Sequence, residues 1–164
     1  LGELLALTPA DFNFETHTLR INKSYQRLHR EDVITPPKTL KSNRTIKMPQ
    51  FLCDEMQDYL KILYEPKEDE RIFTISKSYL HHEMNRGSKI SGVKRIRVHD
   101  LRHSHVSLLI NMGFTVLAIA DRMGHESIDI TYRYAHLFPS EQTQMAEQLD
   151  IERMEKLNGE KSGQ

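Results

Sequence analysis

The feature that most limits the fold is a pair of helix-length apolar runs in the second half, each closed by a glycine. Apolar residues recur at helical spacing over residues 99–112, and Gly113 follows at once. Residues 116–123 repeat this pattern and end at Gly124. Because glycine readily adopts the left-handed conformation that ends a helix, the spacing predicts two short helices joined by a tight turn.

The first half combines short extended segments with a longer amphipathic helix. Strands are predicted at residues 11–14, 18–22 and 44–48. Pro49 suits the start of a helix that runs to about Tyr64. Further helices are expected at 76–86, 127–135 and 140–157, with a polar connector at 87–92. The predicted fold class is therefore α+β, a mostly helical domain with a small three-stranded antiparallel sheet.

Length and composition exclude several classes of protein. A chain of 164 residues suits one compact domain, and its apolar stretches are far below membrane-spanning length. The single cysteine, Cys53, excludes an internal disulfide and any multi-cysteine metal site. We therefore expect a reducing, cytoplasmic location.

The distribution of charge is more informative than the net charge, which is zero. Residues 38–47 and 86–97 are two basic stretches without a single acid, whereas acids gather at 65–70 and from residue 141 onward. Two such patches fit contact with a phosphate backbone, although two ordinary solvated faces would have the same composition. The predicted DNA contacts are Lys41, Arg44 and Arg95.

The strongest chemical signal lies between residues 98 and 139, in V-H-D-L-R-H-S-H, M-G-H-E-S and T-Y-R-Y-A-H-L-F-P. His99 and Arg102 are three residues apart and share one helix face. An arginine fork can bind two oxygens of one phosphate, and a histidine beside it can move a proton near neutral pH. His125 can be aimed at the same pocket by the glycine turn before it. Tyr132 and Tyr134 are then the candidate nucleophiles.

Other histidines invite different interpretations. His103 and His105 are expected to have packing or hydrogen-bonding roles. The nine histidines also suggest a metal site, but the zinc-protease pattern H-E-x-x-H is absent, because Arg86 stands where its second histidine would be. We expect neither a metal nor another cofactor.

Together these motifs resemble the tyrosine recombinases, or phage-type integrases, and especially those of Gram-positive phages and conjugative transposons. G-E-L-L-A-L at the start, K-T-x-K-S-x-R-T-I near residue 38 and the three motifs above occur in the family's order. The resemblance implies a catalytic domain over residues 1–139, truncated at its N-terminal end. It also implies a C-terminal helix and tail over 140–164 that is exchanged between protomers.

The resemblance assigns catalytic roles to Lys38, His99, Arg102, His125 and the nucleophile Tyr134. The family's tyrosine usually lies nine residues beyond the histidine that follows the glycine, which selects Tyr134 over Tyr132. Lys41 is the second candidate for the lysine's role. The family also has an arginine that would fall immediately before Leu1. We expect the parent protein to carry it, and this stretch alone to be catalytically impaired.

The function implied is site-specific recombination that integrates or excises a mobile element through a 3′-phosphotyrosyl intermediate. Its partners would be double-stranded DNA at attachment sites, a Holliday junction, three further protomers in a tetramer and accessory DNA-bending proteins. No membrane is implied, and the location would be the bacterial cytoplasm. Two alternatives remain at this point, a type IB topoisomerase-like enzyme and a non-catalytic DNA-binding module with the same fold.

Overall fold

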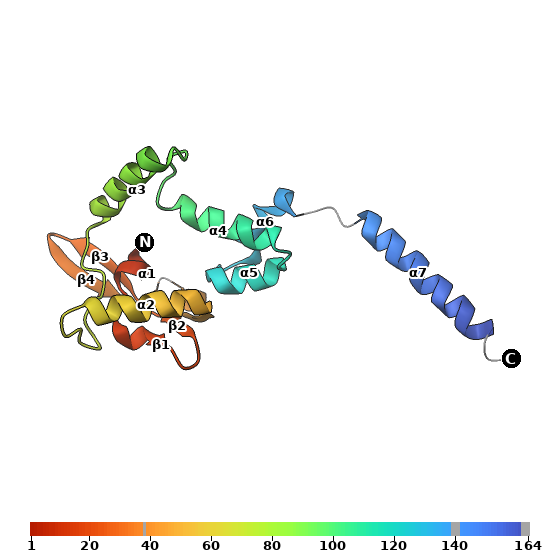
Figure 1. Cartoon of the computed structure of the whole chain (residues 1–164), viewed down its shortest axis with the longest axis horizontal. Helices are drawn as coiled ribbons and strands as arrows, with labels where there is room; N and C mark the ends of the chain where they lie inside the picture. The colour runs from red at the N-terminus through yellow and green to blue at the C-terminus, as the bar shows by residue number, and fades with distance from the viewer. Residues whose placement is uncertain (38, 139–141, 162–164) are drawn as a thin grey trace.

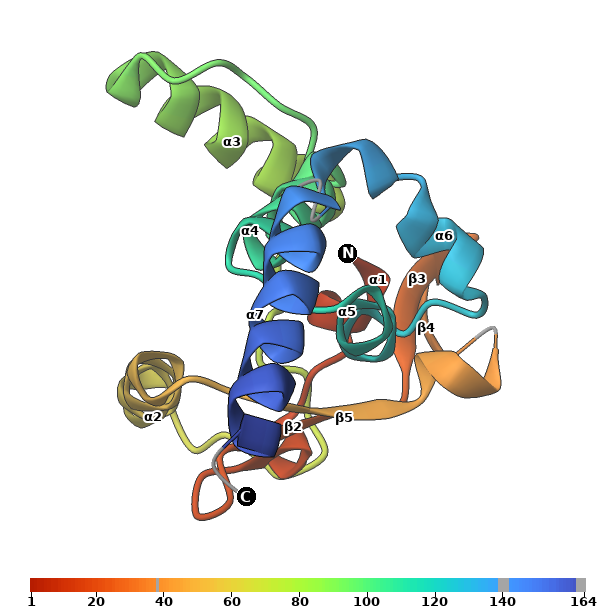
Figure 2. The same cartoon turned by 90° about the vertical axis from the view of Figure 1, so that its right-hand side faces the viewer.

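Two groups of elements and one projecting helix make up the protein (Figure 1), and the projecting helix lies in front of the rest of the molecule in Figure 2. The computed structural model describes residues 1–37, 39–138 and 142–161. The first group holds α1 (Gly2–Leu5), β1 (Phe12–Asn13), β2 (Thr18–Ile21), β3 (Ser24–Leu28), β4 (Glu31–Thr35), β5 (Arg44–Lys47) and α2 (Gln50–Ile62). After α3 (Lys77–Ser91), the second group holds α4 (Asp100–Asn111), α5 (Val116–Met123) and α6 (Ile128–Tyr132). The projecting helix is α7 (Gln142–Lys161).

The three predicted strands form one antiparallel sheet in the order β1-β2-β5, which confirms the predicted sheet. In β2, Leu19 and Ile21 are buried while Arg20 between them is exposed, the alternation expected of a strand with one covered face. Leu19 pairs with Ile46 of β5, which fixes the register of the two longer strands. Two hydrogen bonds join β5 to Arg122 of α5, one donated by Arg44 and one accepted by the backbone oxygen of Lys47.

A second antiparallel pair, β3–β4, was not predicted. Tyr25 pairs with Ile34, and the two strands are joined by His29 and Arg30, whose φ angles are 49° and 71°. Positive φ at both central residues is the geometry of a tight two-residue hairpin turn, which usually carries asparagine or glycine. Because neither residue is one of these, the turn has no recognisable signal in the sequence.

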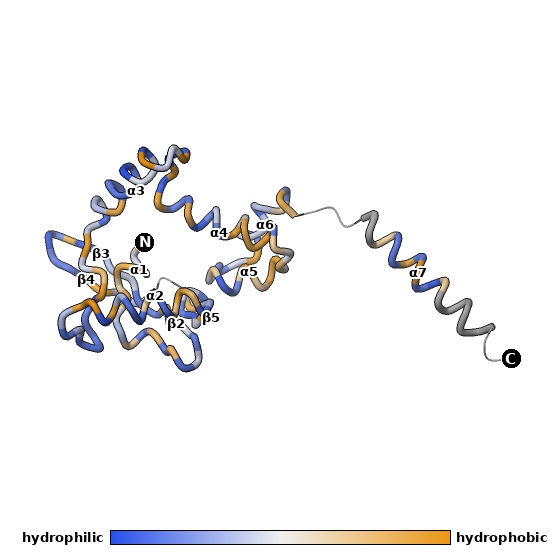
Figure 3. Tube along the Cα trace, viewed as in Figure 1, coloured by the Kyte–Doolittle hydropathy of each residue, from blue (hydrophilic) through white to orange (hydrophobic). Residues whose placement is uncertain are grey.

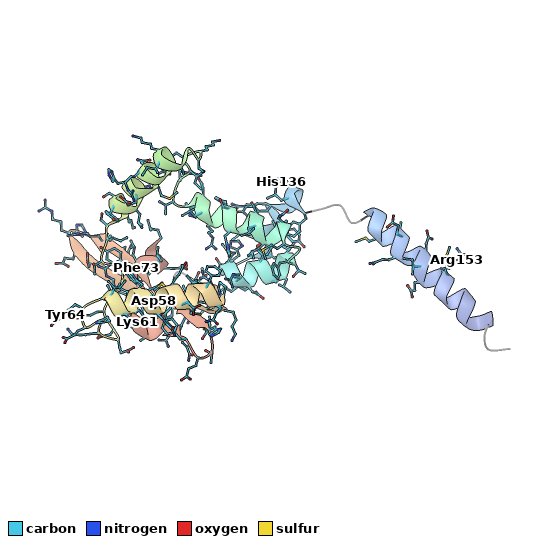
Figure 4. All side chains as sticks on the ribbon, in the orientation of Figure 1. Asp58, Lys61, Tyr64, Phe73, His136 and Arg153 are labelled. Carbon is cyan, nitrogen blue, oxygen red and sulfur yellow. The ribbon has the colours of Figure 1, made fainter. Side chains whose placement is uncertain are left out.

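Helix α2 covers the sheet and closes the main core. A cluster of buried side chains lies beneath it, formed by Leu7, Leu19, Ile21, Met48, Cys53 and Ile72. The opposite face of α2 is polar, and Asp58 and Lys61 form an exposed ion pair there with a 2.9 Å separation (Figure 4). The predicted helix is thus confirmed, with Pro49 as the residue before its first turn.

The helices of the second half follow the predicted order, with one correction. Helix α3 continues through Gly87 to Ser91, so the predicted polar connector at 87–92 is wrong except for Gly92, which ends the helix with φ 70°. A glycine inside a helix costs only about 1 kcal/mol, which neighbouring residues can offset. Helices α4 and α5 pack through a second buried cluster, Val106, Ile110, Ile119 and Met123.

Helix α7 projects away from both groups (Figure 1). Hydropathy along the chain is mixed on its described stretch (Figure 3), and Met145, Leu149, Ile151 and Met154 are each about half or more exposed. Arg153 on this helix lies far from His136 at the end of the helical group (Figure 4). None of the helices in the described ranges combines the length and apolar character that a bilayer crossing requires.

Candidate active site

Helix α4 begins at the candidate site and supplies two of its predicted residues. His99 precedes the first residue of the helix, and Arg102 lies in its first turn. The start of the helix is held by Asp100, which accepts hydrogen bonds from the backbone and side chain of Arg97. These hydrogen bonds, the one from the Arg97 side chain first, lower the pKa of Asp100 to about 2. His99 and Arg102 line one cavity of about 560 Å³, and Glu3 contributes to its wall.

Arg102 is oriented by the end of α5. Its Nη2 donates a hydrogen bond of 2.6 Å to the backbone oxygen of Met123. The side chain is partly buried, and burial, followed by the positive charge of Arg44, lowers its pKa. The negative charge of Glu3, which is paired with Arg44, partly counteracts this effect, and Arg102 itself forms no ion pair with a carboxylate of the described residues.

His125 lies directly after the turn that ends α5. It is 7% exposed, and its Nδ1 is 2.7 Å from the hydroxyl oxygen of Thr131, a fully buried residue of α6. Burial, and then the charges of Arg102 and Arg44, lower the pKa of His125. The imidazole is therefore neutral at pH 7 and fixed in orientation by α6.

Arg44 connects three parts of the site through a set of contacts that we call the Arg44 brace. Its guanidinium binds both carboxylate oxygens of Glu3 at 3.1 Å and donates to the backbone oxygens of Ser42 and Arg122 at 3.0 Å. Its side chain is 12% exposed. This placement favours an internal structural role over the DNA contact predicted from the sequence.

The Arg44 brace explains why the turn before His125 needs glycine. Gly124 has φ 66°, and a Cβ atom there would lie 2.9 Å from Cδ and Nη1 of Arg44 and 3.0 Å from the backbone oxygen of Lys41. Both the left-handed backbone and the close approach of Arg44 therefore exclude a side chain. Arg44, Arg102 and His125 together form what we call the clamp side of the site.

Tyr134 lies in the turn after α6, within reach of α4. Its hydroxyl is hydrogen-bonded to Nδ1 of His103, and the two rings are 5.7 Å apart between centroids. The ring of His99 meets that of His103 edge-on at 5.1 Å. Tyr134 also interacts electrostatically with Arg102. We call His99, His103 and Tyr134 the nucleophile side. The other candidate, Tyr132, is 52% exposed, and its hydroxyl forms no hydrogen bond with the described residues.

The remaining predicted residues lie at the edge of the site or beyond the described ranges. Lys38 falls outside the described residues. Lys41 is exposed in the segment between β4 and β5, where it lines a small pocket with Glu126. Arg95 lies between α3 and α4 and donates a hydrogen bond to Asn85.

Sequence reasoning missed four contributors to the site, namely Glu3, Arg44 in its structural role, His103 as the partner of Tyr134, and Thr131. Glu3 and Arg44 are far apart in sequence, so nothing in either motif signals their ion pair. His103 was expected to pack or to form a hydrogen bond, and so was His105, whose Nε2 accepts one from Arg122. In the part of the chain that the structure describes, no three His, Cys, Asp or Glu side chains gather in a way that could hold a metal ion.

Comparisons with known proteins identify the family. The model of the phage integrase family matches residues 1–141. The ICEBs1 integrase of Bacillus subtilis is 32% identical over 163 residues, which cover 91% of this chain and 44% of that protein. A tyrosine recombinase XerC-like protein of Caldanaerobacter subterraneus is 26% identical, over 91% of this chain and 45% of its own length. The chain thus spans less than half the length of these curated relatives.

A solved structure gives the same fold. The integrase of transposon Tn1549, in complex with a circular intermediate DNA, matches with a TM-score of 0.71 at 20% identity, over 92% of this chain and 54% of that one. The match confirms the α+β fold expected from the sequence, a helical domain with a small antiparallel sheet. With the family model matched over nearly the whole body of the molecule, the chain belongs to the phage integrase family of tyrosine recombinases.

Proposed function

We propose that this protein breaks and rejoins DNA at specific sites, with Tyr134 as the nucleophile, to integrate or excise a mobile element. The observation that carries the proposal is the position of the Tyr134 hydroxyl, which is bound to His103 and lies in the electrostatic field of Arg102. A nucleophile next to a proton acceptor and a phosphate-binding cation is the arrangement that covalent phosphoryl transfer requires. Membership of the phage integrase family supports the same chemistry.

The clamp side would bind the phosphate under attack. Arg102 offers a planar fork to two non-bridging oxygens, and a bound phosphate would be attracted by its charge and by that of Arg44. If Nδ1 of His125 accepts the hydrogen of Thr131, Nε2 carries its own hydrogen and donates to a phosphate oxygen. These donors would stabilise the charge that grows on the phosphoryl oxygens in the transition state.

The covalent step would exchange one phosphodiester for another. Tyr134 attacks the phosphorus, a 3′-phosphotyrosyl bond forms, and the bond to the 5′-oxygen breaks. The leaving oxygen needs a proton because an alkoxide leaves poorly, and Lys38 is the proposed acid, with Lys41 as the second candidate. His99 would assist proton transfer. The covalent bond retains the phosphodiester energy, so the mechanism needs neither ATP nor a metal ion.

Assembly is part of the proposal. Four protomers would act on two DNA sites through a Holliday junction, with accessory DNA-bending proteins, in the bacterial cytoplasm. The exposed apolar side chains of α7 fit a helix that docks on a neighbouring protomer. An apolar pocket of about 560 Å³ between β5 and the α4–α5 pair, lined by Met48, Leu109, Met112, Phe114, Ala118 and Ile119, offers a surface of matching character. Lys41 and Arg95 are the proposed backbone contacts.

The test is covalent capture on a nicked DNA duplex from the ends of the element, with the protein expressed at full length. The nick lets the short 5′-hydroxyl fragment diffuse away, so the protein stays attached to DNA and migrates as an adduct on a denaturing gel. We expect the adduct to map to Tyr134 by mass spectrometry and to disappear completely in Tyr134→Phe. The matched control, Tyr132→Phe, should form the adduct as the wild type does.

Other outcomes would point elsewhere. An adduct on Tyr132 would keep the enzyme class and reject the assignment of the nucleophile. DNA binding without any adduct would favour a non-catalytic module with the recombinase fold. Relaxation of supercoiled DNA without strand exchange would favour a topoisomerase-like enzyme.

A further inference from the structure

The cavity that holds His99 and Arg102 is larger than the single phosphate under attack requires. Its volume is about 560 Å³, and pockets that hold whole small molecules measure about 300–1,000 Å³. Three residues without a role in the proposed mechanism also line it, namely Ser24, His81 and Arg97. They come from β3, from α3 and from the connection between α3 and α4. We call these three residues the Arg97 wall of the cavity.

Arg97 is held in place and still keeps free donors. Its Nε and Nη2 donate hydrogen bonds to the carboxylate of Asp100 at 3.1 Å and 2.8 Å, and its backbone N–H donates to the same carboxylate. A guanidinium carries five N–H donors, and those on Nη1 form no hydrogen bond with the described residues. The side chain is 78% exposed. Asp100 thus fixes the direction of the guanidinium and leaves one nitrogen for a ligand.

The carboxylates at this cavity are already paired. Glu3 lines the cavity and is bound by Arg44, and Asp100 is bound by Arg97. Arg102, by contrast, forms no ion pair with a carboxylate of the described residues. The cavity therefore keeps an unpaired positive charge next to the free donors of Arg97, and this combination favours an anionic ligand.

Ser24 and His81 add neutral donors to the Arg97 wall. The hydroxyl of Ser24 forms no hydrogen bond with the described residues, so its proton is available to a ligand oxygen. His81 is exposed on α3, and a neutral imidazole carries one N–H donor in either tautomer. Arginine and serine side chains are among the groups that commonly bind the phosphates of DNA.

DNA bound at Arg102 would bring a further phosphate to the Arg97 wall. Successive phosphates of one strand lie about 3.4 Å apart along the axis of B-DNA. We infer that the Arg97 wall binds the phosphate of the cleaved strand next to the one under attack, with Arg97 as the main ligand. This inference rests on the proposed function and adds a second phosphate site to it. Because phosphate contacts fix the register of a protein on DNA, two neighbouring ones would hold the attacked phosphodiester in place.

Another basic cavity of the protein is less suited to a phosphate. Lys23 and Arg71 line a cavity of about 290 Å³. Each of them is already bound to a carboxylate, at 2.7 Å and 2.8 Å. Glu68 and Asp69 line the same cavity and form no ion pair with the described residues. Their negative charges would repel a phosphate, whereas the carboxylates at the Arg97 wall are paired.

The test removes the charge of single phosphates and of Arg97 in turn. Duplexes from the ends of the element would carry one neutral methylphosphonate at either phosphate that flanks the scissile one on the cleaved strand. Affinity is measured by fluorescence anisotropy with full-length Tyr134→Phe protein, so that no cleavage interferes. At one of the two positions the neutral group should weaken binding about threefold to tenfold, the size of one net hydrogen bond. Arg97→Ala in this background should bind the normal duplex more weakly by a similar factor and lose nothing further on the modified one.

Three other variants separate a phosphate contact from a structural role at the start of α4. Asp100→Asn removes the charge that holds Arg97 and keeps Arg97 itself, so binding should stay sensitive to the same methylphosphonate. Arg97→Lys should regain part of the affinity, because it keeps the charge and lacks the planar fork. The matched control is Lys61→Ala, which removes an exposed cation whose ion pair with Asp58 on α2 has the same spacing. Arg97→Ala should reduce the salt dependence of log affinity by about one, and Lys61→Ala should leave it unchanged.

Each result supports or rejects the second phosphate site. Methylphosphonate effects that simply add to that of Arg97→Ala, or no effect at either flanking phosphate, would overturn it and leave the proposed function intact. Equal losses in Arg97→Ala and Asp100→Asn on every duplex would show a role in capping α4 alone, and would overturn it too. Failure of covalent capture by the wild type would reject the proposed function; the affinity comparison uses protein that cannot cleave, so the two failures are told apart. An effect that disappears in Arg97→Ala and persists in Asp100→Asn and Lys61→Ala would establish the inference.

Discussion

The clamp side and the nucleophile side of the site lie next to each other but are built differently. On the clamp side, the polar side chains are buried or partly buried, and each is bound by groups from at least one other element. On the nucleophile side, both histidines are exposed, and Tyr134 packs its ring against the α4–α5 cluster while its hydroxyl is hydrogen-bonded to His103. The polar groups of the clamp side are fixed by several elements of the fold, whereas the reacting hydroxyl of Tyr134 is held by one hydrogen bond.

The difference matches what each side is proposed to do. Groups that stabilise charge in a transition state are most effective when they are already in position, because no reorganisation is then needed during the reaction. A tyrosine that forms and later breaks a bond to DNA has to change partners, so a single exchangeable hydrogen bond suits it. Substitutions on the clamp side should therefore combine losses of stability and rate, whereas those on the nucleophile side should affect the rate alone.

Arg102 gives the largest effect expected on the clamp side. Removing one preorganised donor to a developing oxyanion typically lowers a rate about 100-fold to 1,000-fold, so we expect a loss of that size in Arg102→Ala. Arg102→Lys should regain only part of it, because lysine keeps the charge but lacks the planar fork. Single-turnover cleavage of the nicked duplex measures both variants. Equal rates for Lys and Arg at this position would mean that charge alone matters and that the fork has no role.

Gly124→Ala tests whether the Arg44 brace contributes to the clamp side. The new Cβ would lie 2.9 Å from two atoms of Arg44, and alanine would also have to adopt φ 66°. The left-handed backbone alone costs about 1–2 kcal/mol for a residue other than glycine, and the contact with Arg44 adds to it. We expect a lower free energy of unfolding in urea and slower cleavage, since Arg44 and the following histidine must shift.

Gly113→Ala is the matched control for this experiment. Gly113 has φ 83°, and no heavy atom of another segment lies within 4 Å of the position that a Cβ would take, so alanine there meets the backbone cost without the contact. It should lose stability by about 1–2 kcal/mol and cleave DNA like the wild type. If the two variants lost stability equally and both cleaved normally, the Arg44 brace would have no part in orienting the site.

The sequence predicted elements whose determinants are local. Helix α5 was predicted at its observed bounds, because its apolar spacing and the glycine after it are both visible in one short stretch. The three strands of the main sheet were also found from their composition. The β3–β4 hairpin was missed because His29 and Arg30 occupy a turn that normally carries asparagine or glycine. Helix α3 was ended too early because its interior Gly87 resembles a helix stop.

The candidate site was predicted through motifs, and its supporting contacts were not. His99, Arg102, His125 and Tyr134 stand in recognisable patterns, and the structure brings them to the α4, α5 and α6 region of the molecule. Glu3 and Arg44 are 41 residues apart, and their ion pair depends on how β5 lies beside α1. The contact between His103 and Tyr134 likewise depends on how the turn after α6 folds back on α4. Such pairings are determined by tertiary packing, which no local pattern encodes.

The smallest expected effect concerns the pH dependence of stability on the clamp side. Burial, and then the charges of Arg102 and Arg44, lower the pKa of His125 in the folded protein. The unfolded chain therefore binds more protons than the folded one at pH values between the folded pKa and the ordinary histidine value of about 6.5. Stability from this residue is present above that window and is lost as the pH falls through it. Urea unfolding between about pH 5 and 7.5 should show the loss.

Substitutions of single histidines show which residue causes this decrease in unfolding free energy on acidification. His125→Gln should have a shallower decline in unfolding free energy on acidification than the wild type. His105→Gln should remove a separate part, because burial and then Arg122 lower the pKa of His105 as well. A His125→Gln protein that declines as steeply as the wild type would mean that the fold does not hold His125 neutral. The pH dependence of stability would then not come from the clamp side.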